Sequence, residues 1–202
     1  MGHARRLFLL LIVGLFLALP TTAFLCGVER WKLKTCKDTT VNRLFVHNNI
    51  NDGLKTAEHT DIVTLAGLPR PSVLGNTRAA TAERKIWVIE ATLTDYKEEK
   101  GSTGDNDYHL ALKDDDGNAM IAEIPKPTCV TATTPEPLRD MIHKARADFD
   151  DRFTVTGGFK QTQTKVRITG PAMFDIIHGT PQRGVADNGI EIHPVIKIEF
   201  LN

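Results

Sequence analysis

The feature of this sequence that most restricts its fold is a pair of alternating apolar segments separated by a short acidic turn. Every second side chain is apolar in both segments, and these residues are Tyr108, Leu110, Leu112, Met120, Ala122 and Ile124. Such alternation is typical of β-strands with one buried face. A shift of one residue in the pairing would turn one strand over, so only some registers bring both apolar sets together.

Among these registers we favour the one in which Asp114 faces Asn118. The loop then has three residues and places Gly117 at the left-handed position that a type I turn with a bulge requires. A two-residue turn would place Glu123 among the leucines, and we reject it for this reason. The favoured register brings His109 opposite Glu123, on the face that points away from the apolar interior.

A strand precedes this hairpin and a helix follows it. Residues 85–94 alternate as a half-buried strand does. Residues 135–149 carry apolar side chains at helical spacing, and Thr133 or Thr134 is available as the N-cap. The sequence therefore predicts one amphipathic helix between the hairpin and the strands that come after it.

Further strands are predicted in the C-terminal part of the chain. We expect short strands over residues 153–159 and 166–170, and a last strand that runs from Ile190 almost to the C-terminus. Isoleucines occupy one face of this last strand, and Glu191 and His193 lie on its other face.

The order of these elements is strand, hairpin, helix and strands. An oligonucleotide/oligosaccharide-binding (OB) barrel places its helix between the third and fourth strands, and this chain does the same. We therefore predict a mainly β domain with one helix, folded as a small OB-like barrel. An α+β fold, in which an antiparallel sheet packs against one helix, is the alternative.

The N-terminus is typical of a secretory signal. Two arginines precede an apolar run over residues 7–19, and small residues follow up to Ala23. The run is too short for a transmembrane helix, which needs roughly 20 apolar residues. A lipid anchor at Cys26 would require a small residue before it, and Leu25 stands there. We therefore predict a signal peptide over residues 1–23, a mature chain without a transmembrane helix, and export to the periplasm or the medium.

The mature chain divides into an arm and a domain. Residues 24–84 show no sustained periodicity, and we predict an arm with short elements that wraps the domain; disorder is the alternative. Residues 85–202 are predicted to form the OB-like β domain. With 25 basic and 25 acidic residues the chain has no basic excess, so we do not expect a nucleic-acid partner.

Three cysteines remain after cleavage, which is an odd number for an oxidising compartment. One disulfide and one spare thiol account for them most simply. We favour the pair Cys26–Cys129, which would tie the arm to the domain, over the pair Cys26–Cys36, which would close only a small local loop.

Four segments resemble a group of uncharacterised exported bacterial proteins. They are residues 29–35 (ERWKLKT), 107–110 (DYHL), 120–125 (MIAEIP) and 189–195 (GIEIHPV), and the likeness covers most of the mature chain. The resemblance implies an exported, barrel-like domain and brings no established activity. Glycine is usual in that group where this chain has Cys36, which implies that Cys36 is the spare thiol.

The candidates for ligand or metal binding are Asp107, His109, Glu123 and His193. A carboxylate beside an imidazole can raise the proton affinity of the imidazole or share a metal ion with it. Two imidazoles and one or two carboxylates suffice for a divalent transition metal, and an open coordination position would allow hydrolysis. The simpler interpretation, which we favour, is that these residues are solvated on the outer face of the sheet and form ordinary cross-strand pairs.

The motifs of common enzyme classes are absent from the sequence, including the Gly-x-Ser-x-Gly elbow and the His-Glu-x-x-His helix. The leading hypothesis is therefore an exported, non-enzymatic binding or interaction module with an unknown ligand or envelope partner. The alternative is a metal-dependent hydrolase that uses His109, Glu123 and His193. The sequence identifies no cofactor.

Overall fold

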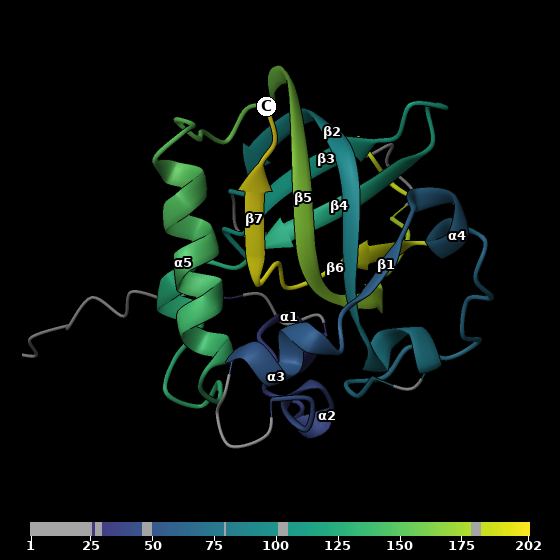
Figure 1. Ribbon diagram of the computed structural model, residues 1–202, viewed down its shortest axis with the longest axis vertical. Coiled ribbons are helices and arrows are strands. Elements are labelled where there is room, and N and C mark those ends of the chain that lie inside the picture. The colour runs from purple at the N-terminus through teal and green to yellow at the C-terminus, as the bar shows by residue number, and fades with distance from the viewer. Residues whose placement is uncertain (1–25, 27–29, 46–49, 79, 101–104, 179–182) are drawn as a thin grey trace, which may run out of the picture.

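Seven strands of this mainly β protein form one sheet, part of which closes into a ring (Figure 1). The structure is a computed structural model that describes residues 26, 30–45, 50–78, 80–100, 105–178 and 183–202. The predicted signal peptide, residues 1–23, lies outside the described residues. The strands are β1 (Glu58–Thr60), β2 (Ile86–Glu98), β3 (Tyr108–Lys113), β4 (Ala119–Ile124), β5 (Lys160–Phe174), β6 (Ile190–Ile192) and β7 (Lys197–Phe200).

The strand order explains the ring. The sheet runs β1-β2-β3-β4-β6-β5-β7, and β5 also pairs with β2, so that β2, β3, β4, β6 and β5 close on themselves. Most neighbours are antiparallel, whereas β4 and β6 run parallel. The apolar side chains that point into the ring form the main core cluster.

The predicted hairpin and its register are confirmed. The pairing of β3 with β4 runs from Tyr108 opposite Ile124 to Leu112 opposite Met120, and these side chains lie in the main core cluster. Gly117 has a φ of 89°, which is the left-handed conformation that the predicted turn requires. Local alternation and the turn glycine therefore determine this part of the fold.

Three of the predicted strands differ from the structure. Residues 153–159 lie outside the strands, because Phe153 packs on the helix α5 (Leu138–Asp150), with its ring centroid 4.9 Å from that of Phe149. The predicted strand at 166–170 is instead part of the long β5. The predicted last strand is divided into β6 and β7, because Pro194 has no N–H to donate to a neighbouring strand.

The helix α5 is present but begins three residues later than predicted. Thr134, one of the two predicted N-caps, donates its hydroxyl to the backbone oxygen of Thr35 in the arm instead, at 2.9 Å. The buried face of α5 includes Leu138, Ile142 and Phe149. None of the described helices is long and apolar enough to cross a membrane.

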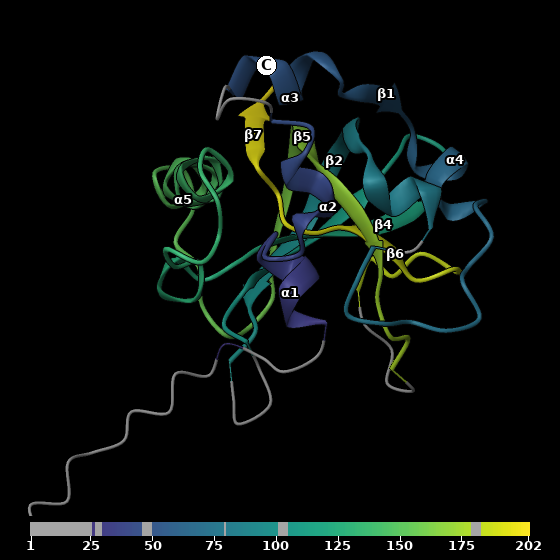
Figure 2. The same cartoon turned by 90° about the horizontal axis from the view of Figure 1, so that it is seen from below.

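The described part of the arm carries four short α-helices: α1 (Trp31–Lys34), α2 (Thr39–Asn42), α3 (Ile50–Lys55) and α4 (Ile62–Ala66). Figures 1 and 2 show α1, α2 and α3 gathered at one end of the strands, whereas α4 lies on the side opposite α5. The arm also supplies β1, which pairs with β2 in parallel.

Buried arginines attach the arm to the ring. The guanidinium of Arg78 is buried and donates to the backbone oxygens of Ala172, Leu33 and His193, at 2.6, 2.9 and 3.1 Å. Arg30 donates to Glu83 at 2.9 Å and also to the backbone oxygen of Phe174. The bonds to Ala172, Phe174 and His193 join the arm to β5 and to the residue that follows β6.

The predicted disulfide Cys26–Cys129 is confirmed, and it joins residues 103 positions apart. Cys36 is a free, buried cysteine. It adopts a φ of 53°, a left-handed conformation that favours glycine.

Candidate functional site

The four candidate residues lie together on the outer side of the ring, away from the apolar core. Asp107 precedes β3, His109 and Glu123 face each other in β3 and β4, and His193 follows β6. Their side chains are not solvated, however, because the exposed fractions are 0%, 1%, 5% and 0% in that order. The prediction of a solvated outer face is therefore wrong, since other parts of the chain cover it.

One cover comes from the segment that begins at Arg183. The backbone oxygen of Arg183 lies 2.7 Å from Nε2 of His109. Gly184 has a φ of 86°, and a Cβ atom there would lie 2.9 Å from Cα of Ala111 in β3. Glycine thus lets this segment lie flat on β3. The ring of Phe159 covers another edge of the His109 imidazole, with centroids 5.4 Å apart.

The other cover is α1, which places Lys34 over the carboxylates. Its Nζ atom lies 3.1 Å from Asp105, 3.6 Å from Asp175 and 3.9 Å from Glu123. These three carboxylates outweigh the desolvation of the buried ammonium and raise the pKa of Lys34 well above its ordinary value. The lysine side chain is therefore a fixed positive charge inside the site.

His193 is surrounded by three carboxylates. Its Nδ1 atom forms a hydrogen bond of 3.0 Å with Glu191 and lies 3.1 Å from Oε2 of Glu123. On the other side of the ring, Nε2 lies 3.2 Å from Oδ2 of Asp107. Burial alone would lower the pKa of His193, but the carboxylates raise it well above its ordinary value.

Glu123 lies between the two imidazoles. Its Oε1 atom is 3.4 Å from Nδ1 of His109, and the same nitrogen lies 3.4 Å from Oε1 of Glu99. Burial opposes ionisation of Glu123, but Lys34 and both histidines hold its pKa well below the ordinary value. The carboxylates similarly overcome burial at His109 and raise its pKa to about 10.

The pKa values of two other carboxyl groups in the cluster are raised, in contrast to that of Glu123. Burial, reinforced by Asp175 and Glu123, raises the pKa of Glu191 to about 8. Burial and the nearby Asp107 raise the pKa of Asp105 to about 6. Burial is the main cause of both shifts, and the neighbouring carboxylates add to it.

Sequence reasoning identified four of these residues and missed the others, namely Lys34, Glu99, Asp105, Asp175 and Glu191. Glu191 was placed on the polar face beside His193 but was not included among the candidates. Lys34 lies in one of the segments that carry the resemblance, which is the only signal that pointed to it. Asp175 has no such signal, because only the fold brings it to Lys34.

The cluster has the residue types of a metal site. Two groups of three among the described residues offer ligand atoms within 4.8 Å of one another: Glu99 with His109 and Glu123, and Asp107 with Glu123 and His193. Carboxylate oxygen and imidazole nitrogen are ligands of divalent transition metals. Without a metal ion, the same arrangement is a buried network of ion pairs.

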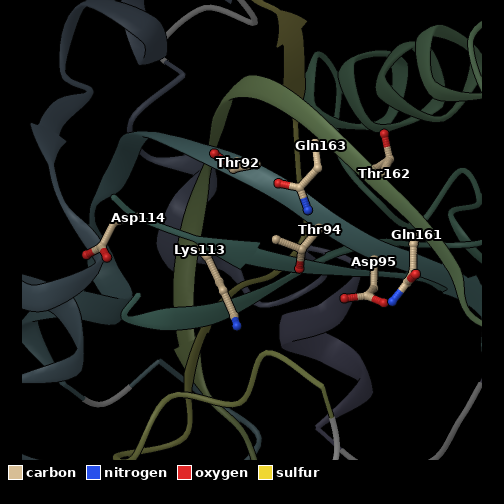
Figure 3. A pocket seen from close by; sticks show the side chains of 8 residues that line it. All are labelled: Thr92, Thr94, Asp95, Lys113, Asp114, Gln161, Thr162 and Gln163. Atoms are coloured by element: carbon tan, nitrogen blue, oxygen red, sulfur yellow. The ribbon is translucent and has the colours of Figure 1, made fainter. Parts of the chain in front are cut away.

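An open groove lies outside this cluster, across β2, β3 and β5 (Figure 3). It measures about 590 Å³ and is lined by polar side chains: Thr92, Thr94, Asp95, Lys113, Asp114, Gln161, Thr162 and Gln163. The pairing of β2 with both neighbours shifts between Leu93 and Asp95. Such a bulge redirects side chains, and here two consecutive residues, Thr94 and Asp95, line the groove.

Comparisons of this chain with protein-family models, with curated proteins and with solved structures find no match.

Proposed function

We propose that this protein is an exported, non-enzymatic binding module with an OB-like barrel, and that the groove across β2, β3 and β5 takes an uncharged, hydroxyl-rich ligand such as an oligosaccharide. The observation that carries the proposal is the contrast between the two sites. The groove is open to solvent. The histidine–carboxylate cluster, which contains Asp107, His109, Glu123 and His193, is buried beneath α1 and the segment at Arg183.

The strand order supports an OB-like barrel. The five strands of the ring follow the order β2-β3-β4-β6-β5, and α5 stands between the third and fourth of them in the chain. This is the position of the helix in OB folds, which bind oligosaccharides and oligonucleotides. The fold makes binding a reasonable role, and the choice of ligand depends on the groove itself.

The lining of the groove favours an uncharged ligand. Figure 3 shows side chains from three strands around the hollow, including Thr94, Lys113 and Gln163. Hydroxyl and amide groups both donate and accept hydrogen bonds, as the hydroxyl groups of a sugar chain require. One lysine and two aspartates give no excess of positive charge, which a nucleic acid would need.

Export is supported by two features. The N-terminal sequence has the pattern of a signal peptide. The disulfide Cys26–Cys129 is of a kind that persists in oxidising compartments and is rare in the cytosol.

The binding proposal is tested by NMR titration of the mature chain. Amide shifts are followed while chitohexaose, cellohexaose or maltohexaose is added, and the oligonucleotide dT10 serves as the nucleic-acid comparison. We expect shifts at residues 92–95, 113–114 and 161–163 with at least one of the sugars, and none with dT10.

Variants make this test specific to the groove. The double variant Gln161→Ala/Gln163→Ala should weaken the response, whereas Asn76→Ala removes an exposed amide elsewhere and should leave it unchanged. Shifts confined to other surfaces, or a response to dT10 alone, would contradict the proposed ligand class.

A metal-dependent hydrolase is the second candidate, because His109, Glu123 and His193 do converge as that hypothesis requires. A hydrolytic metal needs a coordination position open to water and substrate, and the burial of all three residues opposes this. Zinc-stimulated hydrolysis of a p-nitrophenyl ester or phosphate that is lost in Glu123→Gln would favour the hydrolase over the binding module.

A further inference from the structure

Three buried atoms of the histidine–carboxylate cluster have no hydrogen-bond partner. They are Oδ2 of Asp107, Oε2 of Glu123 and Nε2 of His193, and no described residue or other atom of the structure provides them with a hydrogen bond. Asp107 Oδ2 faces His193 Nε2, and Glu123 Oε2 lies 3.1 Å from the other ring nitrogen, Nδ1. The distance of 3.2 Å between Asp107 Oδ2 and His193 Nε2 is short enough for such a bond, but the two groups are not aligned for one. Orphaned polar atoms at this depth are costly unless something binds them.

The remaining polar atoms of two of these residues are firmly held. The backbone N–H of Lys126 donates to Oδ1 of Asp107 at 2.9 Å. Nδ1 of His193 is bonded to Glu191 at 3.0 Å. Histidines that bind metals commonly donate their second ring N–H to a carboxylate, which directs the free nitrogen at the ion. The Glu191–His193 pair has this arrangement, with Nε2 left free.

The charge of the cluster also favours a cation. Six carboxylates belong to it: Glu99, Asp105, Asp107, Glu123, Asp175 and Glu191. Even when Glu191 holds its proton, five of them are charged, whereas the described cationic groups in contact with them, with both imidazoles protonated, are four: Lys34, Lys97, His109 and His193. Buried charge without compensation is unfavourable, and a divalent ion would offset the excess.

We infer that Asp107, Glu123 and His193 hold one divalent transition-metal ion, of which Zn²⁺ and Mn²⁺ fit the ligands best. One nitrogen and two carboxylate oxygens are a ligand set that both ions accept. One ligand atom from each of the three residues lies within 4.8 Å of the other two. Small side-chain movements would bring these atoms to bond lengths of roughly 2.0–2.2 Å around one ion.

The role of this ion is structural. Its ligands come from the residue before β3, from β4 and from the residue after β6, so it joins three neighbouring parts of the ring. The ligands are closed off from solvent, as in metal sites that stabilise a fold. This inference is independent of the proposed ligand groove, which lies elsewhere on the ring.

The test is isothermal titration calorimetry of the EDTA-treated mature chain with ZnCl₂ and MnCl₂, together with native mass spectrometry. We expect one ion per chain and a rise in Tm on loading. His193→Gln and Asp107→Asn should abolish binding, and Glu191→Gln should weaken it roughly 10–100-fold, because it only orients the imidazole. His59→Gln, which removes an exposed imidazole, should bind as the wild type does.

Two results would overturn the assignment. The first is the absence of stoichiometric uptake of either ion by the wild-type chain. The second is loss of binding in Glu99→Gln and His109→Gln with retention in His193→Gln, which would move the ion to the neighbouring group of three. If the buried variants do not fold, X-ray absorption of the zinc-loaded wild type tests the ligand types: we expect one imidazole and oxygen ligands, and a sulfur ligand or two imidazoles would contradict the assignment, while His109→Gln, if it keeps zinc, excludes the neighbouring group of three.

Discussion

Lys34 and Asp105 form a buried ion pair of 3.1 Å that joins the arm to the segment leading into β3. The two residues are 71 positions apart, and the same ammonium also faces Asp175 and Glu123. The arm therefore supplies the positive charge that offsets these buried carboxylates. The contact that attaches the arm to the ring is thus also a part of the site.

Replacement of this lysine is expected to be strongly destabilising. Lys34→Met keeps the apolar length of the side chain but leaves the facing carboxylates without their ammonium. Removing one partner of a buried ion pair costs about 3–5 kcal/mol. Urea unfolding of the variant measures the loss, and Lys32→Met, an exposed lysine of the same helix, should change stability by less than about 0.5 kcal/mol. Equal effects of the two variants would show that the buried pair contributes little.

The hairpin of β3 and β4 could be predicted from the sequence because its determinants are local. The alternation, the acidic turn and Gly117 lie within a few residues of one another, and together they specify the register that brings His109 opposite Glu123. The pairing of Cys26 with Cys129, favoured over Cys26–Cys36 because it would tie the arm to the domain, is the pairing in the structure.

The burial of the site could not be predicted in the same way. It depends on Lys34 and on the segment at Arg183, which approach His109 and Glu123 only after the chain has folded. A polar strand face has the same sequence pattern whether it is exposed to water or covered by another segment of the chain. The position of His193 beside the hairpin likewise depends on the parallel pairing of β4 with β6, which local periodicity does not encode.

Cys36 provides a test of backbone conformation. Its φ of 53° is costly for any residue with a Cβ atom, by about 1–2 kcal/mol. Replacing alanine by glycine at a buried position normally costs roughly 1–2 kcal/mol in lost burial and chain entropy. We therefore expect Cys36→Gly and Cys36→Ala to have the same free energy of unfolding within about 0.5 kcal/mol.

The control for this comparison is Ala145→Gly in α5, at a buried position with ordinary helical geometry. It should lose about 1–2 kcal/mol in the same urea experiment. A Cys36→Gly variant that is less stable than Cys36→Ala by that amount would contradict the role assigned to the left-handed backbone.

The disulfide is expected to contribute substantially to stability. Cys26 and Cys129 are 103 residues apart, and a crosslink over a chain of this length restricts the unfolded state by about 3–5 kcal/mol. Cys26→Ser/Cys129→Ser should lose this amount in urea unfolding, whereas Cys36→Ala keeps the crosslink and should respond to reductant as the wild type does. A loss below about 1 kcal/mol would mean that the arm is held by its other contacts alone.

The free thiol should not interfere in that experiment. Burial raises the pKa of Cys36 to about 11, so little thiolate is present to attack the disulfide. In the folded protein Cys36 should react slowly with a thiol reagent, and it should react rapidly once urea unfolds the chain.

The pH dependence of stability has a definite sign. The pKa of Glu191 is raised from 4.5 to about 8, mainly by burial, so the folded chain holds this proton where the unfolded chain has released it. Stability therefore falls as the pH rises from about 4.5 to 8. His109, with a pKa raised from 6.5 to about 10, contributes stability that is complete below 6.5 and is lost as the pH rises toward and through 10. The lowered pKa of Glu123 changes stability only at pH values near and below its ordinary pKa of 4.5.

The two contributions act in the same direction, so metal-free protein in EDTA should be less stable at about pH 9 than at about pH 5.5 by a few kcal/mol. Urea unfolding across this range measures the slope. Glu191→Gln cannot ionise, so its profile should be flatter between about pH 5 and 8. The variant Glu58→Gln, at an exposed carboxylate of β1, should keep the wild-type slope. A Glu191→Gln profile parallel to that of the wild type would show that this carboxyl group does not hold its proton in the folded chain, and stability that increased with pH over this range would contradict both assignments.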